Sequence, residues 1–248
     1  MTRELSAREL WNATEPGKHA SRCDRASALP EAAARYLEHA VAPGTPLAST
    51  VRLRMHGEIR LQRWFPFRAE EVIQRGRGMI WCATVRMYGL PVRGSDRFLD
   101  GDGAMRWKLL GVIPVVTASG PDVTRSAAGR LAAESVWLPS ILLEDGVRWT
   151  VLGASELEAR LTLQGHPMEL RLTVGGDGRL EALALKRWGN PDGGEFRLGD
   201  FGGMVDEEGT FGGYTVPTRL RVGWGFNAGR LDSDRESFRV TVDEATYR

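Results

Sequence analysis

The stretch GDFGGMVDEEGTFGGYTVPTRLRVGWGF, residues 199–226, contains two Phe-Gly-Gly triplets, at 201–203 and 211–213, and an alternating run that begins near Thr215. Glycine pairs beside aromatic rings let the backbone adopt positive φ while a large side chain packs close by. This pattern is typical of a strongly curved antiparallel β-structure with tight connections. Such a backbone can also approach a bound molecule closely, although the stretch does not identify that molecule.

Apolar and polar residues alternate with the period of a β-strand on both sides of this stretch. The glycine-rich segments 100–103 and 175–178 predict hairpin turns, and Gly57 predicts a bulge or turn. About ten strands at this spacing predict a mainly β fold, a curved antiparallel sheet or half-barrel. The alternating runs are 51–56, 79–87, 92–99, 104–110, 147–152, 157–163, 168–174, 180–188, 216–224 and 238–242.

Two or three helices accompany the predicted sheet. Apolar residues at helical spacing predict helices at 30–42 and 121–137, the second capped by Asp122 or Thr124. One further helical turn is expected within 4–11. We expect residues 1–28 to form a loose polar arm and residues 29–248 to form a single β-rich domain, with two helices packed on or in the concavity of the sheet.

Composition excludes several classes of partner and location. The 33 basic and 32 acidic residues give a net charge of +1, which argues against a nucleic-acid-binding or membrane-surface role for the whole chain but leaves room for a local basic patch. No apolar run is long enough to span a membrane, and the N-terminus lacks the apolar segment of a signal peptide. We therefore expect a cytoplasmic location.

Metal and cofactor motifs are missing from the sequence. His19, His39, His56 and His166 are widely spaced, and the two cysteines, Cys23 and Cys82, do not make a disulfide framework. The sequence contains no Gly-x-Ser-x-Gly elbow and no phosphate-binding loop. We therefore predict no metal site, no cofactor and no nucleophile of a known motif.

Carboxylates provide the better indication of chemistry. Glu134 follows Arg130 by four residues, so both lie on one helix face, next to Leu131 and close to Trp137. Burial of Glu134 would raise its pKa and make it usable as a general acid or base. The alternative is an internal Arg130–Glu134 salt bridge that fixes the helix to the sheet.

Two further charged groups lie beside predicted strands. Asp96 precedes Arg97 and is a second candidate for proton transfer. Arg187 precedes Trp188 at the end of a strand and could stack on a ring or hold an anionic group. A salt bridge at the rim of the sheet is the open alternative for Arg187.

Aromatic residues suggest a pocket for an apolar ligand. The sequence contains eight tryptophans, and indoles combine a large apolar area with one N–H donor. Tyr214 follows Gly213 and could present its hydroxyl to the interior. An ordinary β core would explain most of these rings equally well. The aromatic candidates for a ligand-binding cavity are Trp81, Trp107, Trp137, Trp188 and Tyr214.

Several blocks together resemble a family of bacterial proteins known only as a domain of unknown function. The blocks are LPEAAARYLEHAVAPGTPLASTVRLRMHGEI, WFPFRAEEVI, SDRFLDGDGAMRWKLLGVIPVV, GRLAAESVWLPSILL, RWGNPDG and FGGYTVPTRLRVGW. They cover most of the chain from about residue 29 onward, in one order. The resemblance implies a curved antiparallel sheet with helices on one side, a shape similar to that of bacterial lipoprotein carriers, which hold an acyl chain in a half-barrel. It implies no activity and no site residues.

Three functions are consistent with these observations. The first is binding of an apolar or amphipathic small molecule in the concave face, with polar contacts from Arg130, Glu134 and Arg187. The second is a cofactor-free acid–base enzyme, an isomerase, cyclase or hydrolase, in which Glu134 or Asp96 transfers the proton. The third is a protein-interaction module that docks a partner through a strand edge or an aromatic patch. The sequence leaves the oligomeric state open.

Overall fold

The computed structural model describes residues 5–14 and 29–248, so most of the predicted N-terminal arm, with His19 and Cys23, lies outside the described residues. The first six strands are β1 (Thr50–Arg60), β2 (Trp64–Gln74), β3 (Gly78–Met87), β4 (Leu90–Leu99), β5 (Asp102–Leu109) and β6 (Ile113–Ser119). The next seven are β7 (Arg148–Val151), β8 (Glu156–Leu163), β9 (His166–Val174), β10 (Leu180–Gly189), β11 (Arg197–Phe211), β12 (Tyr214–Trp224) and β13 (Glu236–Tyr247).

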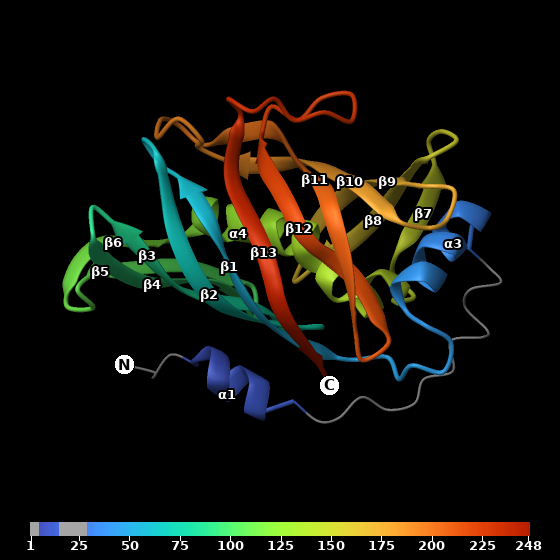
Figure 1. The fold of residues 1–248 in the computed structure, drawn as a ribbon, viewed down its shortest axis with the longest axis horizontal. Coiled ribbons are helices and arrows are strands. Elements are labelled where there is room, and N and C mark those ends of the chain that lie inside the picture. Colours follow the sequence, from blue (N-terminus) through green and yellow to red (C-terminus); the bar gives the residue numbers. More distant parts are fainter. Residues whose placement is uncertain (1–4, 15–28) are drawn as a thin grey trace.

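Within the described residues these strands form one antiparallel sheet in the order β6-β5-β4-β3-β2-β1-β13-β12-β11-β10-β9-β8-β7. The last strand, β13, pairs with the first, β1, and so joins the two halves of the chain. The sheet is strongly curved and does not close, because β6 and β7 remain at its two edges (Figure 1). The predicted class, a mainly β, curved antiparallel sheet, is confirmed.

The predicted number of strands is too low, since the sheet has 13. Each of the three missed strands departs from simple alternation. β2 contains Pro66 and the acidic pair Glu70-Glu71, whereas β6 is exposed over nearly its whole length. β11 contains three consecutive acids, 206–208, and several glycines. Strand pairing, and not local pattern, makes these segments extended.

The two Phe-Gly-Gly triplets have different roles. Gly212 and Gly213, both with positive φ, form the tight turn that connects β11 to β12. Gly202 and Gly203 lie inside β11, where they pair with β10 and β12. Gly57 is also inside a strand, so no turn occurs there, although β1 has a register shift close by, between Arg54 and Met55. A Cβ on Gly57 would lie 1.9 Å from the Arg239 carbonyl oxygen of β13, and glycine permits this close pairing.

Three α-helices occur within the described residues, α1 (Ala7–Asn12), α3 (Glu31–Ala40) and α4 (Pro121–Glu134). Two 3₁₀ turns, η1 (Ser135–Trp137) and η2 (Pro139–Leu143), follow α4. The predicted helices at 30–42 and 121–137 are therefore confirmed apart from their ends. The predicted caps of the second helix are wrong, because its N-cap is Gly120 and the Thr124 hydroxyl instead accepts the Gly103 N–H, at 2.9 Å.

The helices do not all lie on one side of the sheet. α4 crosses the concave face and packs on β10, β5 and β4 (Figure 1). α1 lies on the convex face, where Leu10 and Trp11 are buried against Val72 and Ile80. The expected loose arm is therefore a packed helix over residues 7–12. α3 packs near the start of β12, where Val41 pairs with Tyr214.

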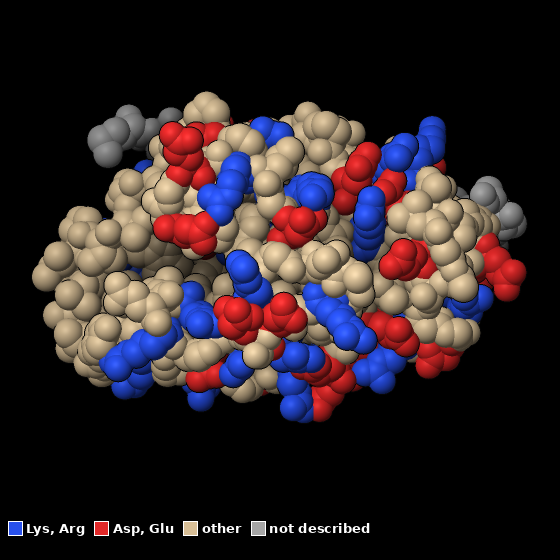
Figure 2. Space-filling view, turned by 90° about the horizontal axis from the view of Figure 1, so that it is seen from above, with Lys and Arg blue, Asp and Glu red and all other residues tan. Residues whose placement is uncertain are grey.

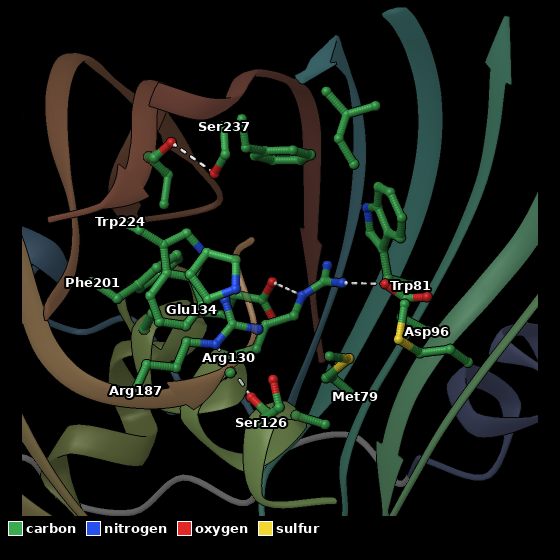
Figure 3. Close-up of a pocket in the computed structure, with 18 of the residues that line it drawn as sticks. Met79, Trp81, Asp96, Ser126, Arg130, Glu134, Arg187, Phe201, Trp224 and Ser237 are labelled. Carbon is green, nitrogen blue, oxygen red and sulfur yellow. Dashed lines mark hydrogen bonds and ion pairs between the residues drawn. The ribbon is translucent and has the colours of Figure 1, made fainter. Parts of the chain in front are cut away.

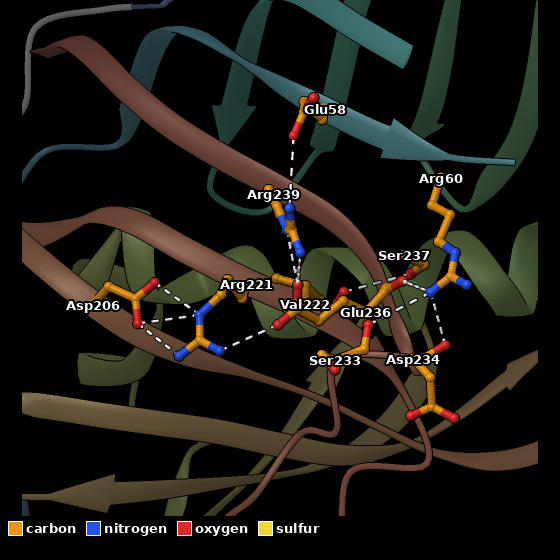
Figure 4. Close-up of polar contacts among 10 residues, drawn as sticks. All are labelled: Glu58, Arg60, Asp206, Arg221, Val222, Ser233, Asp234, Glu236, Ser237 and Arg239. Carbon is orange, nitrogen blue, oxygen red and sulfur yellow. Dashed lines mark hydrogen bonds and ion pairs between the residues drawn. The ribbon is translucent and has the colours of Figure 1, made fainter. Parts of the chain in front are cut away.

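An ion network fixes the convex face where β1, β13, β12 and β11 meet (Figure 4). Glu236 is buried and accepts hydrogen bonds from Arg221 and Arg239 at 2.7 to 3.1 Å. Arg221 also contacts Asp206, and Arg239 lies 3.8 Å from Glu58. The network ties four strands together on the side opposite α4.

Candidate functional site

The register of the sheet aligns a row of side chains on the concave face. Glu71 of β2 pairs with Trp81 of β3, Trp81 pairs with Asp96 of β4, and Asp96 pairs with Met105 of β5. Paired residues in an antiparallel sheet point to the same face. Two carboxyl groups and an indole therefore lie side by side, although residues 71 and 105 are far apart in the sequence.

α4 supplies the groups that face this row. Its residues Ser126, Ala127, Arg130 and Glu134 follow helical spacing and point toward the sheet. Gly129 lets the helix approach β10, because a Cβ there would lie 3.0 Å from Cγ of Arg187. A small residue on the helix thus makes room for a long side chain that reaches over it.

Arg130 is the centre of a cluster of three carboxyl groups. Its Nε lies 2.6 Å from Glu134, one terminal nitrogen lies 3.2 Å from Asp96, and the other lies 3.5 Å from Glu71. The guanidinium also lies over the Trp81 ring, 4.8 Å from its centroid. Figure 3 shows Arg130 between Glu134 and Asp96, with Trp81 beside it. One cation therefore serves three acids, all of them largely buried.

Burial and crowding shift the protonation of these acids. Burial, followed by repulsion from Glu134, raises the pKa of Glu71 well above its ordinary value of 4.5. Burial also raises the pKa of Asp96, although Arg130 and a 2.8 Å hydrogen bond from the Trp107 indole oppose the shift. A side-chain hydrogen bond between Glu71 and Glu134, which requires a proton on one of the two carboxyl groups, adds to the shift. The protonated form of Glu71 is therefore favoured at neutral pH.

Arg187, from β10, differs from Arg130 in its partners. Its guanidinium lies 4.6 Å from the Phe201 ring centroid and 5.6 Å from that of Trp224. Its Nε donates to the Ser126 carbonyl at 3.3 Å, and no carboxylate lies within ion-pair distance among the described residues. Burial and repulsion from Arg130 lower the pKa of Arg187 to about 10, so it still carries its charge at neutral pH.

A cavity of about 360 Å³ separates α4 from the concave face. Its walls are mainly apolar and aromatic, and Trp81, Trp137 and Trp224 are the largest of its side chains. The polar groups on its surface include Asp96, Arg130, Glu134 and Arg187 (Figure 3). A mainly apolar cavity with a few converging polar groups is typical of a small-molecule site.

The structure brings six of the nine residues predicted from the sequence into the lining of this cavity. These are Trp81, Asp96, Arg130, Glu134, Trp137 and Arg187.

The other three predicted residues, Trp107, Trp188 and Tyr214, lie outside the lining. Trp107 packs on Trp81 and holds Asp96, and Trp188 donates to Asp122 at 2.8 Å. The Tyr214 hydroxyl donates to the Pro46 carbonyl at 2.7 Å, away from the cavity, because the ring stacks on Tyr247. Tyr214 therefore fixes the turn at 46–48 instead of presenting its hydroxyl to a ligand.

Sequence reasoning missed Glu71 and several rings. Glu71 lies in a strand that the pattern did not predict, and its partners come from β3 and α4. Phe201, Trp224 and Phe238 reach the cavity from three different strands. The alternation of β12 indicated an inward face for Trp224, but nothing local indicated that this face meets α4.

Metal binding has little support among the described residues. No group of three His, Cys, Asp or Glu side chains is arranged to hold a metal ion in residues 5–14 and 29–248. His56 instead pairs with Asp243 at 2.9 Å on the outer surface.

Within residues 5–14 and 29–248, no helix is long and apolar enough to cross a membrane.

Comparison with known proteins gives a family but no activity. The model of a family of unknown function, DUF6544, matches residues 19–232, so the chain belongs to that family. No curated protein sequence matches the chain.

Two solved structures are similar in outline. A LolA superfamily protein from Nitrosomonas europaea is 11% identical, with a TM-score of 0.45, over 88% of this chain and 92% of that one. A putative outer membrane lipoprotein-sorting protein domain from Vibrio parahaemolyticus is 9% identical, with a TM-score of 0.40, over 81% of this chain and 86% of that one.

Proposed function

Since this member of a family of unknown function has a mainly apolar cavity under its curved sheet, we propose that it binds an apolar or amphipathic small molecule there. The cavity of about 360 Å³ between α4 and the concave face is the observation that carries the proposal. This volume falls within the range of about 300–1,000 Å³ common for small-molecule sites. Apolar parts of the ligand would contact Trp81, Trp137 and Trp224.

The polar end of such a ligand would lie at Arg187. Arg130 is already shared by three carboxyl groups, whereas Arg187 contacts only a carbonyl oxygen and two rings among the described residues. A guanidinium can bind a carboxylate or phosphate through two parallel hydrogen bonds. We therefore expect an anionic end to bind Arg187.

Native mass spectrometry of the protein purified from its own host, followed by denaturation, would identify a bound molecule. Titration with anilinonaphthalene sulfonate, an amphipathic fluorescent anion, tests the same cavity without knowledge of the natural ligand. Ala127→Phe should abolish the fluorescence increase, because the ring would fill space beside Arg130, whereas Ala127→Ser should preserve it. Equal binding by both variants would place the probe elsewhere and contradict the proposal.

A matched pair of ligands tests the orientation. Dodecanoate and dodecanol share the same apolar chain, and only the first carries a negative charge. Arg187→Met should weaken dodecanoate binding by about tenfold or more, which corresponds to the loss of a charge-assisted hydrogen bond. Dodecanol binding should change little. A similar loss for both ligands would mean that Arg187 only shapes the cavity.

A second candidate function is proton transfer to or from the bound molecule. The specific observation is that Glu134 lines the cavity and shares a side-chain hydrogen bond with Glu71, whose pKa is raised by burial. Incubation of the co-purified molecule with the protein in D₂O would reveal hydrogen exchange at carbon. We expect Glu134→Gln to stop the exchange, and exchange at an unchanged rate would remove Glu134 from this role.

A further inference from the structure

Exposed apolar side chains gather at one end of the sheet. Among the described residues, eight of the eleven exposed large apolar side chains lie in or next to three turns, those between β1 and β2, β3 and β4, and β5 and β6. Val112 is 70% exposed and Tyr88 is 66% exposed. We call this set the apolar tip, and it comprises Leu61, Tyr88, Leu90, Leu110, Val112, Ile113, Val115 and Val116.

The three turns are neighbours in space. The Tyr88 ring lies 5.3 Å from that of Phe65, just after the β1–β2 turn. The N–H of Leu110 donates to the Pro91 carbonyl at 2.9 Å, which joins the β3–β4 and β5–β6 hairpins. Figure 1 shows the turns along the end of the molecule that holds β5 and β6, and Figure 2 shows few charged side chains at that end. The apolar tip is therefore one surface and not eight scattered residues.

Basic side chains without acidic partners border the apolar tip. Arg68 pairs across the sheet with Thr84, Thr84 with Arg93, and Arg93 with Lys108, so three positive charges lie in one row on the convex face. Arg86 lies on the same face, two residues beyond Thr84. None of these four basic residues has an acidic side chain within ion-pair distance in the described part of the chain.

Arg63 adds a fifth positive charge at the apolar tip itself. Its guanidinium lies 4.1 Å from the Tyr88 ring centroid, and the residue is exposed. The segments 84–94 and 105–118 contain no Asp or Glu. This end of the protein is thus both apolar and positively charged, although the whole chain has a net charge of only +1.

We propose that the apolar tip docks on an anionic lipid bilayer, with its apolar side chains in the interface and the basic row against the headgroups. Apolar side chains combined with basic residues are what such surfaces bind. A second copy of the chain fits less well, because a two-fold contact would press two basic rows together. The apolar side chains also stand on three separate turns, which suits a deformable surface better than a rigid partner.

The apolar tip lies next to the cavity. Ile59 and Arg60 line the cavity and directly precede Leu61 in the chain. Docking on a bilayer would therefore bring the cavity close to a source of apolar molecules. Bilayer docking does not depend on the proposed ligand binding, because it is argued from residues outside the cavity lining.

Vesicle co-sedimentation tests this surface. The full chain should bind vesicles made from equal parts of phosphatidylglycerol and phosphatidylcholine, should bind pure phosphatidylcholine at least about tenfold more weakly, and should be released by high salt. Val112→Asp should weaken binding to the anionic vesicles by about tenfold or more. Val151→Asp is the matched control, because Val151 is 51% exposed at the opposite edge of the sheet, in β7.

Further variants distinguish bilayer docking from self-association and from ligand binding. Arg86→Glu should weaken binding in the same way without altering the apolar surface, and circular dichroism would confirm that each variant is folded. No binding to anionic vesicles, or an equal loss in Val112→Asp and Val151→Asp, would overturn the proposal. Self-association that Val112→Asp abolishes, measured by light scattering in the absence of lipid, would assign the surface to a second copy instead. Vesicle binding that survives when Ala127→Phe blocks the cavity would separate docking from ligand binding.

Discussion

Arg130 and Glu236 are each the centre of an ion cluster, but one lies inside the curved sheet and the other outside it. Arg130 contacts Glu71, Asp96 and Glu134, whose side chains are 0%, 19% and 11% exposed. Glu236 contacts Arg221 and Arg239, whose side chains are 38% and 42% exposed. Both clusters place several charges of one sign around a single opposite charge.

The two clusters compensate their excess of like charges in different ways. In the outer cluster, water and further acids, Asp206 and Glu58, reach the same arginines. In the inner cluster the charged partners are largely buried, and the pKa of Glu71 rises because burial and Glu134 both oppose its charge. Burial, and not the number of charges, thus separates a salt-bridge network that supports the fold from a cluster in which the pKa values of two acids, Glu71 and Asp96, are raised.

Arg130→Met should have the largest effect on the stability of the protein. It leaves three buried carboxyl groups without their shared cation, and breaking such a buried pair costs about 3–5 kcal/mol. Urea unfolding at neutral pH would measure this loss. Arg221→Met is the matched control from the outer cluster and should cost clearly less, because Arg221 is 38% exposed. Equal losses would mean that burial does not distinguish the two clusters.

Glu71→Gln should stabilise the protein, and increasingly so as the pH rises. The folded-state pKa of Glu71 is raised above its ordinary value of 4.5. Between pH 4.5 and that raised pKa, the unfolded chain releases the proton while the folded chain keeps it, so stability falls as the pH rises. The loss approaches about 1.4 kcal/mol per pH unit, and Gln removes it.

Urea unfolding of both proteins from mildly acidic to mildly alkaline pH would test the effect of Glu71→Gln. The two stability curves should meet near pH 4.5 and diverge above it. Parallel curves would show that Glu71 titrates normally and that the inner cluster resembles the outer one.

The inner cluster also shows which contacts could be predicted from the sequence and which could not. The Arg130–Glu134 contact was predictable, because four residues along a helix bring two side chains to one face. The third acid, Glu71, was not, because its place depends on how β2 pairs with β3 and where α4 crosses. Strand register is a long-range property that no local pattern specifies.

The same limit applies to the fold. A strand with clean alternation, such as β9, was predictable because one of its faces is mostly buried and the other is mostly exposed. β6 is exposed on both faces, and β11 carries acids and glycines, so neither shows that alternation. Tyr214 was misplaced for a related reason, since its hydroxyl is held by Pro46, which is 168 residues away in the chain.

Of the three changes, Glu236→Gln should have the smallest effect on stability, and it tests the outer cluster. The amide keeps the size of the side chain and one acceptor oxygen, while Arg221 retains Asp206 and Arg239 retains Glu58. We expect a loss of about 1–2 kcal/mol, as for a charged hydrogen bond weakened to a neutral one. Ligand binding should be unchanged, because Glu236 does not line the cavity. A loss as large as that of Arg130→Met would mean that the outer network holds its charges as tightly as the buried cluster, and exposure would then no longer explain the difference in stability between the two clusters.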